Sequence, residues 1–594
     1  HSTSRRQRQM CIRDRYDINE KLQLETLKSD VRLSGISSQA IDILYNRGFK
    51  TVEEIEQHLY SNLEDMHPTH LMKDSDKFCE IVIEAIENNE EITNYSDYDS
   101  DGVTSSSALV RGIRNAGGKI NYYTNNRFIE GYGITPKGVD NLLEKFPNTK
   151  LIITTDNGIV GYEGIDYANS LGLKVIVTDH HEPGDTLPNA LAIINPKRKD
   201  CEYPFKGLCG AGVVFKLLLQ LYWEMDLDLE YVYDLLDIVA VGTVGDLVPL
   251  VDENRILVKE GLKLVRDEKR VVFKKLREAL NISKIDEETF GFTYCPILNA
   301  LGRIDGSPEE AIELLTTDDE MKMEEIIKSL VALNNYRKEL TKEQELMGIE
   351  MVEGMKDIPH VIVLHHNDFH EGVVGLVAGR LKEKYNRPTI VLASHEKEAI
   401  KEDGRTEVLK VVKGSARSIE GFHIKEVFDS IKECLINYGG HAMAGGVGLL
   451  EENLSEFNEK INQKAKEILK EEDYVKKVLI DTVLNSNEVT VDLVEELSLL
   501  KPFGMEFSRP RFALNGFEVD NKKFKTPYVG SDLSTLRLVS KNDLTLIMFK
   551  HAEIYRNLRE PKKVKAIGTP QLNSYKGVTT AQFMVEGEYL FREK

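Results

Sequence analysis

Acidic residues and histidines occur close together at four places in one part of the sequence. Residues 97–101 carry Asp at alternate positions, Asp156 starts an Asp-Asn-Gly triplet, residues 179–181 read Asp-His-His, and Asp246 ends a Gly-Thr-Val-Gly-Asp run. Carboxylate oxygens are the preferred ligands of Mg²⁺ and Mn²⁺, and imidazole shifts the preference toward Mn²⁺ and softer ions. Two such ions about 3.5–4 Å apart can stabilise both the attacking and the leaving oxygen of a phosphoester displacement. These residue types therefore predict a divalent-metal site for phosphoester hydrolysis.

Each motif taken singly has an ordinary explanation, since alternate aspartates also occur in calcium loops and solvated turns. Their positions relative to predicted strands favour a shared functional site over separate solvated turns. The β-branched runs 151–155 and 173–178 each end at an acidic residue, and residues 97–101 follow a further predicted strand. The carboxyl ends of parallel strands open onto one crevice, where ligands usually bind. We interpret the apolar run 238–241 as another strand, whose end delivers Asp246 to the same pocket.

The elements that must position these residues form an alternating pattern. Amphipathic segments at 105–116, 161–171 and 211–223 separate the strands and predict helices. Strands alternating with helices imply right-handed βαβ units and a mainly parallel sheet, which we place in a catalytic domain at 91–307. Apolar spacings of three and four residues predict a helical region before it, at 16–90. The charged stretch 308–355 is expected to form one long connecting helix.

A second and smaller α/β domain is expected at 356–475. Its predicted strands are 360–364 and 389–393, and its predicted helices are 373–385, 424–434 and 454–470. From 476 to 594 the pattern changes to short alternating strands between turns, for example 535–539, 545–549 and 581–586, as is typical of a small β-barrel. The predicted fold class is α/β, with a parallel-sheet domain and a smaller α/β domain joined by a long helix, followed by a C-terminal barrel.

Charge is distributed unevenly along the chain. The 594 residues carry a net charge of −21, but residues 521–594 hold 14 Lys or Arg against 7 Asp or Glu. Such asymmetry can place a basic binding surface on an acidic protein, although a merely solvated basic surface would give the same counts.

Cysteine usage and apolar runs bear on the cellular compartment. The six cysteines form no C-x-x-C pair, which argues against a zinc ribbon and a disulfide framework and fits a reducing, cytoplasmic location. No apolar run approaches the roughly 18 residues of a membrane span. Residues 1–15 are basic and contain no apolar segment of the kind found in signal peptides. We interpret residues 1–15 as a non-native or disordered tail and leave them out of the fold.

The four acidic motifs, in this order, resemble those of the DHH phosphoesterase superfamily. The closer resemblance is to its RecJ branch, which carries segments similar to residues 126–133, 194–198, 298–303, 414–418 and 439–444. The resemblance extends from about residue 38 to the C-terminus. It implies a single-stranded-DNA-specific 5′→3′ exonuclease that releases mononucleotides and acts in DNA repair and recombination.

The resemblance also implies roles for individual residues. Two Mn²⁺ or Mg²⁺ ions would be held by Asp99, Asp101, Asp156, His180 and Asp246, with Asp156 between the two ions. The predicted catalytic residues are Asp97, Asp156, His180 and His181. Asp97 would be a further ligand or would orient the ligands. His181 would face the scissile phosphate, because neighbouring side chains on extended backbone point apart.

The second α/β domain resembles the DHH-associated domain, whose Gly-Gly-His motif faces the metals across a cleft. There Gly440 would let the backbone approach the substrate closely and His441 would contact phosphate. The positions that in RecJ proteins line the DNA path and hold the terminal 5′ phosphate are matched by Arg127, Arg303, Ser415 and Arg417. Arginine suits this task because its planar guanidinium binds phosphate oxygens bidentately.

The segment 476–594 resembles the oligonucleotide-binding (OB-fold) domain of RecJ, a nucleic-acid-binding barrel that combines stacking aromatics with a cationic groove. Its available aromatic residues are Phe524, Tyr528, Tyr555 and Tyr575. The implied partners are single-stranded DNA with a 5′ phosphate and, as is common for RecJ proteins, a single-strand-binding protein and a helicase. We expect a monomer that does not engage a membrane.

Two alternatives remain open at this level. One is another DHH phosphodiesterase, such as a nano-RNase, a cyclic-dinucleotide enzyme or a pyrophosphatase, which the C-terminal barrel disfavours. The other is a non-catalytic replication scaffold, which the complete set of ligand positions disfavours. The sequence departs from the RecJ pattern at Ser96, Gly445 and Phe369, where Gly, Ala and Trp are usual. None of these departures removes a metal ligand.

Overall fold

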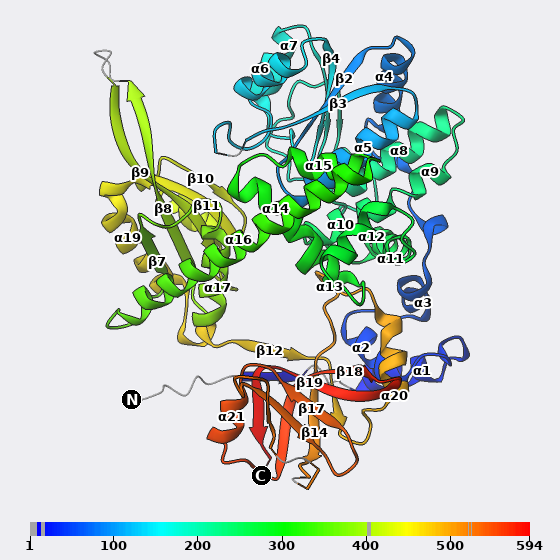
Figure 1. Cartoon of the computed structure of the whole chain (residues 1–594), viewed down its shortest axis with the longest axis vertical. Coiled ribbons are helices and arrows are strands. Elements are labelled where there is room, and N and C mark those ends of the chain that lie inside the picture. The colour runs from blue at the N-terminus through cyan, green and yellow to red at the C-terminus, as the bar shows by residue number, and fades with distance from the viewer. Residues whose placement is uncertain are drawn as a thin grey trace.

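The computed structural model describes residues 9–12, 18–126, 128–400, 406–520, 522–523 and 526–593. Figure 1 shows two α/β units beside each other and a β-rich C-terminal unit below them. Helices from the start of the chain lie against that C-terminal unit, and one long helix, α16, connects the two α/β units.

The first α/β unit is built on a five-stranded sheet in the order β3-β2-β4-β5-β6. Every pair of neighbours in this sheet is parallel, as the alternation of strands and helices predicts. The strands are β2 (Glu91–Ser96), β3 (Lys119–Thr124), β4 (Thr149–Thr155), β5 (Lys174–Thr178) and β6 (Ala192–Ile194).

Helices cover both faces of this sheet, which is why its strands are apolar on both sides. Ile153 of β4 packs into a cluster with α4 (Ser75–Glu87), α5 (Ser100–Asn115) and α8 (Gly210–Glu224). The next side chain along the chain, Ile152, points to the other face, because side chains alternate along a strand. That face is covered by α6 (Pro136–Lys145) and α7 (Tyr162–Ser170).

A layer of helices continues the first unit beyond its sheet. Most of its helices share one apolar core with the start of α16. Its members are α9 (Glu230–Tyr233), α10 (Leu236–Gly245), α11 (Asp252–Arg266), α12 (Val271–Ala279), α13 (Glu287–Thr289), the π-helix η4 (Phe290–Tyr294), α14 (Cys295–Ile304) and α15 (Glu309–Thr316).

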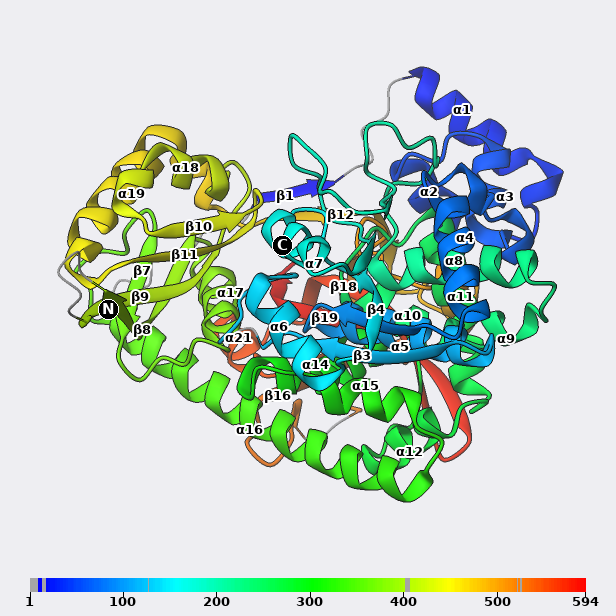
Figure 2. The same ribbon diagram turned by 90° about the horizontal axis from the view of Figure 1, so that it is seen from above.

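The long helix predicted between the two α/β units is confirmed, but the stretch 308–355 holds a second, shorter helix before it. The helix α15 ends at Thr316, and α16 (Glu320–Glu353) begins after Asp319, whose carboxylate accepts hydrogen bonds from the backbone N–H groups of Met321 and Lys322. An N-cap of this kind starts a new helix. The 34 residues of α16 span about 50 Å. Figure 2 shows it running from beside α12 to the second unit.

The second α/β unit has a sheet in the order β10-β11-β9-β8-β7, in which only β7 and β8 are parallel. The predicted strands and helices are confirmed here, with shifted ends. The strands are β7 (Ile362–His366), β8 (Thr389–Ile400), β9 (Thr406–Arg417), β10 (Asn437–Gly440) and β11 (Ala444–Leu450). The helices are α17 (Val374–Tyr385), α18 (Ile424–Ser430) and α19 (Leu454–Ile468).

The C-terminal unit is a seven-stranded sheet in the open order β13-β14-β18-β19-β17-β16-β15. The long strands β18 and β19 form an antiparallel hairpin at its centre. Its strands are β13 (Thr482–Asn485), β14 (Phe512–Glu518), β15 (Tyr528–Val529), β16 (Thr535–Val539), β17 (Thr545–Met548), β18 (Lys563–Tyr575) and β19 (Val578–Arg592). Its helices are α20 (Val491–Leu497) and α21 (Ala552–Asn557).

The helices at the start of the chain do not form a separate core. Ile41 of α2 (Ser38–Asn46) and Ile55 of α3 (Val52–Tyr60) share an apolar cluster with Phe512 of β14. Helix α1 (Ile18–Ser29) belongs to the same cluster. Two regions separated by more than 400 residues in the sequence therefore fold as one unit.

Residues 1–15 were predicted to lie outside the fold, and the part of this segment that the structure describes contradicts the prediction. Residues 9–12 form the strand β1 (Gln9–Ile12), which pairs in parallel with β12 (Lys477–Ile480). The rest of that segment lies outside the described residues. Among the helices that are described, none combines the length and the apolarity needed to cross a membrane.

Candidate metal centre and phosphate-facing cavity

The first three acidic motifs meet because three neighbouring parallel strands end at the same level. In the register of the sheet, Ser96 of β2 lies opposite Thr155 of β4, and Thr155 lies opposite Thr178 of β5. Asp97, Asp156 and Asp179 directly follow these strand ends. The backbone pairing extends one residue further, since the Asp97 N–H donates to the Thr155 carbonyl and the Asp156 N–H to the Thr178 carbonyl. The prediction of one shared sheet edge is confirmed.

Asp246 reaches the same place from a helix, so the prediction of a strand before it is wrong. It caps the C-terminus of α10, and the apolar run 238–241 lies inside that helix. This run is buried on all sides. A short run of uniformly apolar residues has no periodicity that separates a buried helix from a buried strand.

Asp101 is anchored by the N-terminus of another helix. The Gly210 N–H lies 2.6 Å from its Oδ2 and the Ala211 N–H lies 2.9 Å from its Oδ1. These are first N–H groups of α8, which have no partners within the helix and favour an anion. A Cβ on Gly210 would lie 2.8 Å from the Asp156 Cβ, so only glycine fits here. No role for Gly210 was predicted from the sequence. A glycine at the start of a predicted apolar helix is the feature that could have indicated it.

The local backbone conformation sets the positions of two other aspartates. Asp99 is the N-cap of α5 and accepts hydrogen bonds from the N–H groups of Asp101 and Gly102. A Cβ on Gly102 would lie 2.3 Å from the Asp97 carbonyl oxygen, which explains the glycine after the first motif. Asp156 has a φ of 62°, a left-handed conformation that is uncommon outside glycine. Such outliers gather at functional sites.

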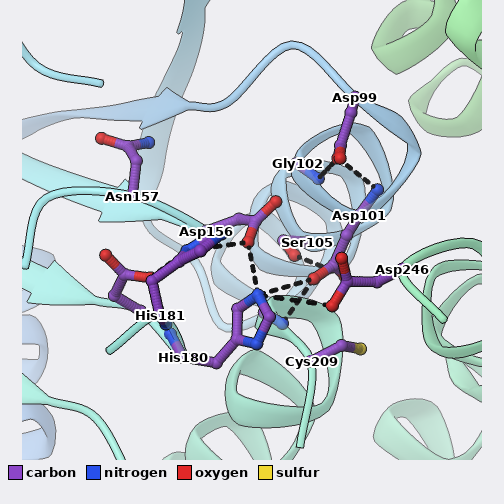
Figure 3. A network of polar contacts seen from close by, with 12 residues as sticks. Asp99, Asp101, Gly102, Ser105, Asp156, Asn157, His180, His181, Cys209 and Asp246 are labelled. Atoms are coloured by element: carbon purple, nitrogen blue, oxygen red, sulfur yellow. Dashed lines mark hydrogen bonds and ion pairs between the residues drawn. The ribbon is translucent and has the colours of Figure 1, made fainter. Parts of the chain in front are cut away.

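The imidazole of His180 points into the group of carboxylates (Figure 3). Its Nε2 lies 3.0 Å from Asp156 Oδ1, 3.5 Å from Asp246 Oδ2 and 3.7 Å from Asp101 Oδ2. None of these contacts has hydrogen-bond geometry, and Nε2 is buried without a partner. Asp156 Oδ1 and Asp97 Oδ1 are also buried without partners. Oxygen and nitrogen lone pairs that converge without a donor among them are suited to a divalent cation.

The pKa values of these side chains also indicate a site for a divalent cation. Burial raises the pKa of Asp97, Asp156 and Asp246 well above the usual range, and neighbouring carboxylates add to this. Burial, followed by the charge of Asp99, raises the pKa of Asp101 to about 6. Burial, followed by the charge of His181, lowers the pKa of His180 to about 3, so its imidazole is neutral and able to act as a ligand.

His181 is oriented by Asp179, with its Nδ1 2.8 Å from Asp179 Oδ1. Burial opposes a charge on this ring, but the hydrogen bond and charge of Asp179 raise the pKa of His181 to about 9. Its ring also lies 3.5 Å from the Tyr132 hydroxyl. Asp179 accepts a further hydrogen bond from the Ile159 N–H, which fixes it between two strand ends.

Three overlapping groups of side chains offer ligand atoms within 4.8 Å of one another. They are Asp97, Asp99 and Asp156; Asp101, His180 and Asp246; and Asp156, His180 and His181. Asp156 and His180 each belong to two groups. The structure thus brings together every residue predicted for the metal site and its immediate surroundings.

A cavity of about 630 Å³ lies between the first and second α/β units. From the first unit it is lined by Tyr98, Tyr132 and Arg303, and from the second by Ser415, Arg417 and Gly440, among others. Tyr98 stands between Asp97 and Asp99, so the cavity borders the metal centre. Three of the four residues predicted to hold a terminal phosphate therefore line one cavity, and the fourth, Arg127, lies outside the described residues.

The arginine and serine on the second unit are already paired to each other. Arg417 Nη1 donates to Ser415 Oγ over 2.7 Å and to the Ala416 carbonyl. A Cβ on Gly375, in the first turn of α17, would lie 3.1 Å from Arg417 Nη2. A helix N-terminus, a guanidinium and a hydroxyl thus share one wall of the cavity, which suits an anion.

The Gly-Gly-His segment lies at the edge of this cavity. Gly439 and Gly440 line it, and Gly440 has a φ of 138°, which side chains rarely tolerate. His441 is exposed and is not among the residues that line the cavity. The close backbone approach predicted for Gly440 is thus possible, whereas a phosphate contact by His441 stays a prediction.

Comparison with known proteins agrees with this architecture. Sequence models match at residues 91–243 (DHH family, N-terminal domain), 359–467 (DHHA1 domain) and 480–587 (RecJ OB domain). The single-stranded-DNA-specific exonuclease RecJ of Bacillus subtilis is 32% identical over 567 residues, which cover 95% of this chain and 69% of that protein. The Escherichia coli protein of the same name is 34% identical over 488 residues, covering 79% of this chain and 81% of its own.

This chain belongs to the RecJ family. A solved structure of RecJ from Thermus thermophilus in complex with Mn²⁺ superposes on this RecJ-family chain with a TM-score of 0.80 at 26% identity. The match covers 99% of this chain and 80% of the Thermus chain. The acidic and histidine groups of the present RecJ-family member are suited to binding such ions.

Proposed function

We propose that this RecJ-family chain is a metal-dependent exonuclease that degrades single-stranded DNA from its 5′ end and releases mononucleotides. One observation carries the proposal: the partnerless His180 Nε2 and its three carboxylate neighbours lie beside a cavity lined by Arg303 and Arg417. A site for divalent cations next to a site for an anion fits hydrolysis near a phosphorylated end. The names of the curated relatives support single-stranded DNA as the substrate.

We assign two Mn²⁺ or Mg²⁺ ions to Asp99, Asp101, Asp156, His180 and Asp246. Asp156 and His180 belong to overlapping groups, which supports Asp156 as the carboxylate shared between the ions. When bound, the ions would activate water and neutralise charge that develops on the phosphate. The backbone N–H groups of α8 hold Asp101 in place for this task. Asp97, which directly follows the strand β2, would orient the ligands from behind.

His181 is proposed to contact the scissile phosphate. Its Nδ1 is hydrogen-bonded to Asp179, which fixes the ring and leaves Nε2 for the substrate. A donor fixed in advance at a place where negative charge increases lowers the barrier without reorganisation. Tyr132, whose hydroxyl lies 3.5 Å from the same ring, would limit the orientations available to the substrate.

The terminal 5′ phosphate is proposed to bind in the cavity, to Arg303, Ser415 and Arg417, with Arg127 and His441 as further contacts. Gly440 would let the strand pass close to the backbone of β10. The C-terminal unit would hold the strand further from its 5′ end through its basic surface. Because these contacts are mostly to phosphates, binding should weaken strongly as salt increases.

The wider role is proposed from the family resemblance. The chain would act as a monomer in the cytoplasm, in DNA repair and recombination, together with a single-strand-binding protein and a helicase.

The test uses single-stranded oligonucleotides labelled near either end, in Mn²⁺. Early release of the 5′ label, abolished by Asp156→Ala and absent on blunt duplex, would support the proposal. Early release of the 3′ label, or cleavage of dinucleotides only, would place the chain with other DHH phosphodiesterases. Binding of DNA without any turnover would indicate a non-catalytic scaffold.

A further inference from the structure

Three large apolar side chains are exposed on segments next to the metal centre. Leu247 directly follows Asp246 and is 65% exposed, Phe292 of the π-helix η4 is 78% exposed, and Met505 is 50% exposed. Exposed apolar residues that gather at one place mark binding sites more often than those scattered singly. We call these three residues the apolar platform.

The three residues are brought together by backbone contacts. Met505 pairs with the chain just after Leu247, because the Leu250 N–H donates to the Met505 carbonyl over 2.9 Å and Pro249 bridges to Met505. The π-helix packs on the last turn of α10, since a Cβ on Gly291 would lie 3.4 Å from Val244. Asp246 caps that same turn. The three residues of the platform therefore lie on or beside the segment that delivers a predicted metal ligand.

The local conformation at the platform is costly, which suggests a purpose other than stability. Leu247 has a φ of 58°, a left-handed conformation that a branched apolar residue rarely adopts. In the π-helix, Phe290 and Tyr294 are buried while Phe292 between them faces outward. π-Helical turns are uncommon and are frequent at functional sites. Strained backbone and outward-facing apolar side chains thus coincide beside Asp246.

Helix α14 runs from this platform to the cavity between the two α/β units. Its first residue, Cys295, contacts the end of α10, because a Cβ on Gly245 would lie 2.7 Å from the Cys295 Sγ. Near its middle, Asn299 donates to the Ser100 hydroxyl in the first acidic motif. Its last turn carries Arg303, which lines the cavity. The ten residues of α14 span about 15 Å, the length of about four stacked nucleotides at 3.4 Å each.

Cationic side chains lie beyond the platform, toward the C-terminal unit. Lys284, Lys501 and Arg509 line a second cavity of about 370 Å³ between the first α/β unit and the C-terminal unit, together with Asp286 and Glu288. Lys284 lies 3.7 Å from Asp286. The three cations are close enough that Lys284 and Arg509, after burial, contribute to lowering the pKa of Lys501. Arg509 also pairs with Glu288, just before the π-helix. Apolar surface next to cations is the combination that single-stranded nucleic acids require, for bases and phosphates respectively.

We propose that Phe292, supported by Leu247 and Met505, stacks on a base about four nucleotides from the 5′ end of the strand. This rests on the proposed function, which places the 5′ phosphate at Arg303 and the scissile bond at the metal centre. The platform holds the strand on the 3′ side of the scissile bond, so that each cleavage leaves the remaining strand bound. Phe292 is thereby a positioning residue, since it does not touch the reacting atoms.

The experiment measures base stacking directly and without turnover. A series of 5′-phosphorylated oligonucleotides carries the fluorescent base 2-aminopurine at each of the first eight positions, and emission is recorded on binding in EDTA. The wild-type chain should quench 2-aminopurine most strongly near the fourth position, and Phe292→Ala should remove that maximum. Phe292→Trp should retain it. The matched control is Trp223→Ala, because Trp223 is 72% exposed but stands at the end of α8.

Affinity gives a second readout in the same variants. Loss of one base–aromatic stack should raise the Kd of Phe292→Ala for a long oligonucleotide about five- to a hundredfold and leave the Kd for a trinucleotide unchanged. An unchanged quenching profile in Phe292→Ala, no quenching in the wild-type chain, or equal weakening for both lengths would overturn the platform. If the quenching maximum is found but the chain releases no nucleotides in Mn²⁺, the exonuclease proposal fails and the platform stands.

Discussion

Two regions of the first α/β unit bury charge, and they do so in opposite ways. At the metal centre, the carboxylates of Asp97 and Asp156 each keep a buried oxygen without a hydrogen-bond partner. At the joint with the C-terminal unit, the buried guanidinium of Arg255 on α11 donates to the carbonyls of His58, Leu500, Lys501 and Pro502. We call this second region the Arg255 joint.

The difference helps to distinguish buried charges of a candidate binding site from buried charges with a structural role. Burial of a charge is costly in both places. In the Arg255 joint, hydrogen bonds with four carbonyls offset the cost and connect α3, α11 and the chain before β14. At the metal centre no hydrogen bond offsets the cost for these oxygens, and their lone pairs are available to the proposed ions. In these two regions, unused lone pairs on several converging side chains accompany a candidate binding site, whereas complete hydrogen bonding of one guanidinium accompanies a structural joint.

The largest effect is expected from a substitution at the metal centre. Asp156→Ala should lower Mn²⁺-dependent release of nucleotides on the order of a thousandfold or more, because a ligand shared between two ions is removed. Thermal stability in EDTA should stay the same or increase, since a buried carboxylate among other carboxylates is removed. Initial rates and thermal melting of the same preparations check both. A clear fall in the metal-free melting temperature would mean that Asp156 is structural.

The second effect concerns the Arg255 joint. Arg255→Met should cost about 3–5 kcal/mol of unfolding free energy, because buried carbonyls lose their donor. Urea unfolding measures this loss, and nucleotide release by the fraction that stays folded should be preserved. Arg380→Met is the control, because Arg380 forms an exposed pair with Glu345 and exposed pairs contribute about 0–1 kcal/mol. Equal costs for the two variants would contradict the role of the joint.

A smaller effect is expected in the cavity between the two α/β units, where the 5′ phosphate is proposed to bind. Arg417→Lys should raise KM about ten- to a hundredfold for oligonucleotides with a 5′ phosphate, because an ammonium group cannot reproduce a bidentate contact. Oligonucleotides with a 5′ hydroxyl should change little. Steady-state kinetics on the two substrates, with and without the phosphate, makes the comparison. The same loss on both substrates would remove Arg417 from phosphate recognition.

The smallest effect is a pH dependence of the Arg255 joint. The ring of His58 lies between those of Phe49 and Phe507, tilted against both, and burial, followed by the charges of Arg255 and Arg47, lowers the pKa of His58 to about 2. Because the folded-state pKa is depressed, the unfolded chain binds more protons below its own pKa of about 6.5, so stability falls as the pH decreases. At pH 5.5 the loss is about 1.4 kcal/mol.

Comparison with a variant isolates this contribution from those of other groups. His58→Leu should show a weaker decrease in unfolding free energy between pH 7 and pH 5 than the wild-type chain, as measured by urea unfolding at each pH. Parallel curves for the two proteins would show that His58 does not contribute to the acid sensitivity.

The sequence alone determined the local features of this protein. β-Branched runs that end at Asp156 and Asp179 predicted neighbouring parallel strands, because strand propensity and the alternation with helices are properties of short segments. Motif types and their order predicted the candidate metal ligands, which the fold brings together, and the RecJ family, which the similarity to known proteins confirms. The second α/β unit and the C-terminal strands followed from the same local signals.

The tertiary structure decided what depends on contacts between distant segments. The run 238–241 is a helix because it is surrounded by apolar neighbours on all sides, which no local period reveals. Gly210 holds Asp101 from another helix, and Arg303 and Arg417 line the same cavity only because two units enclose it. The helices around Ile41 share a core with Phe512. Such pairings depend on the whole packed chain, so only the folded molecule specifies them.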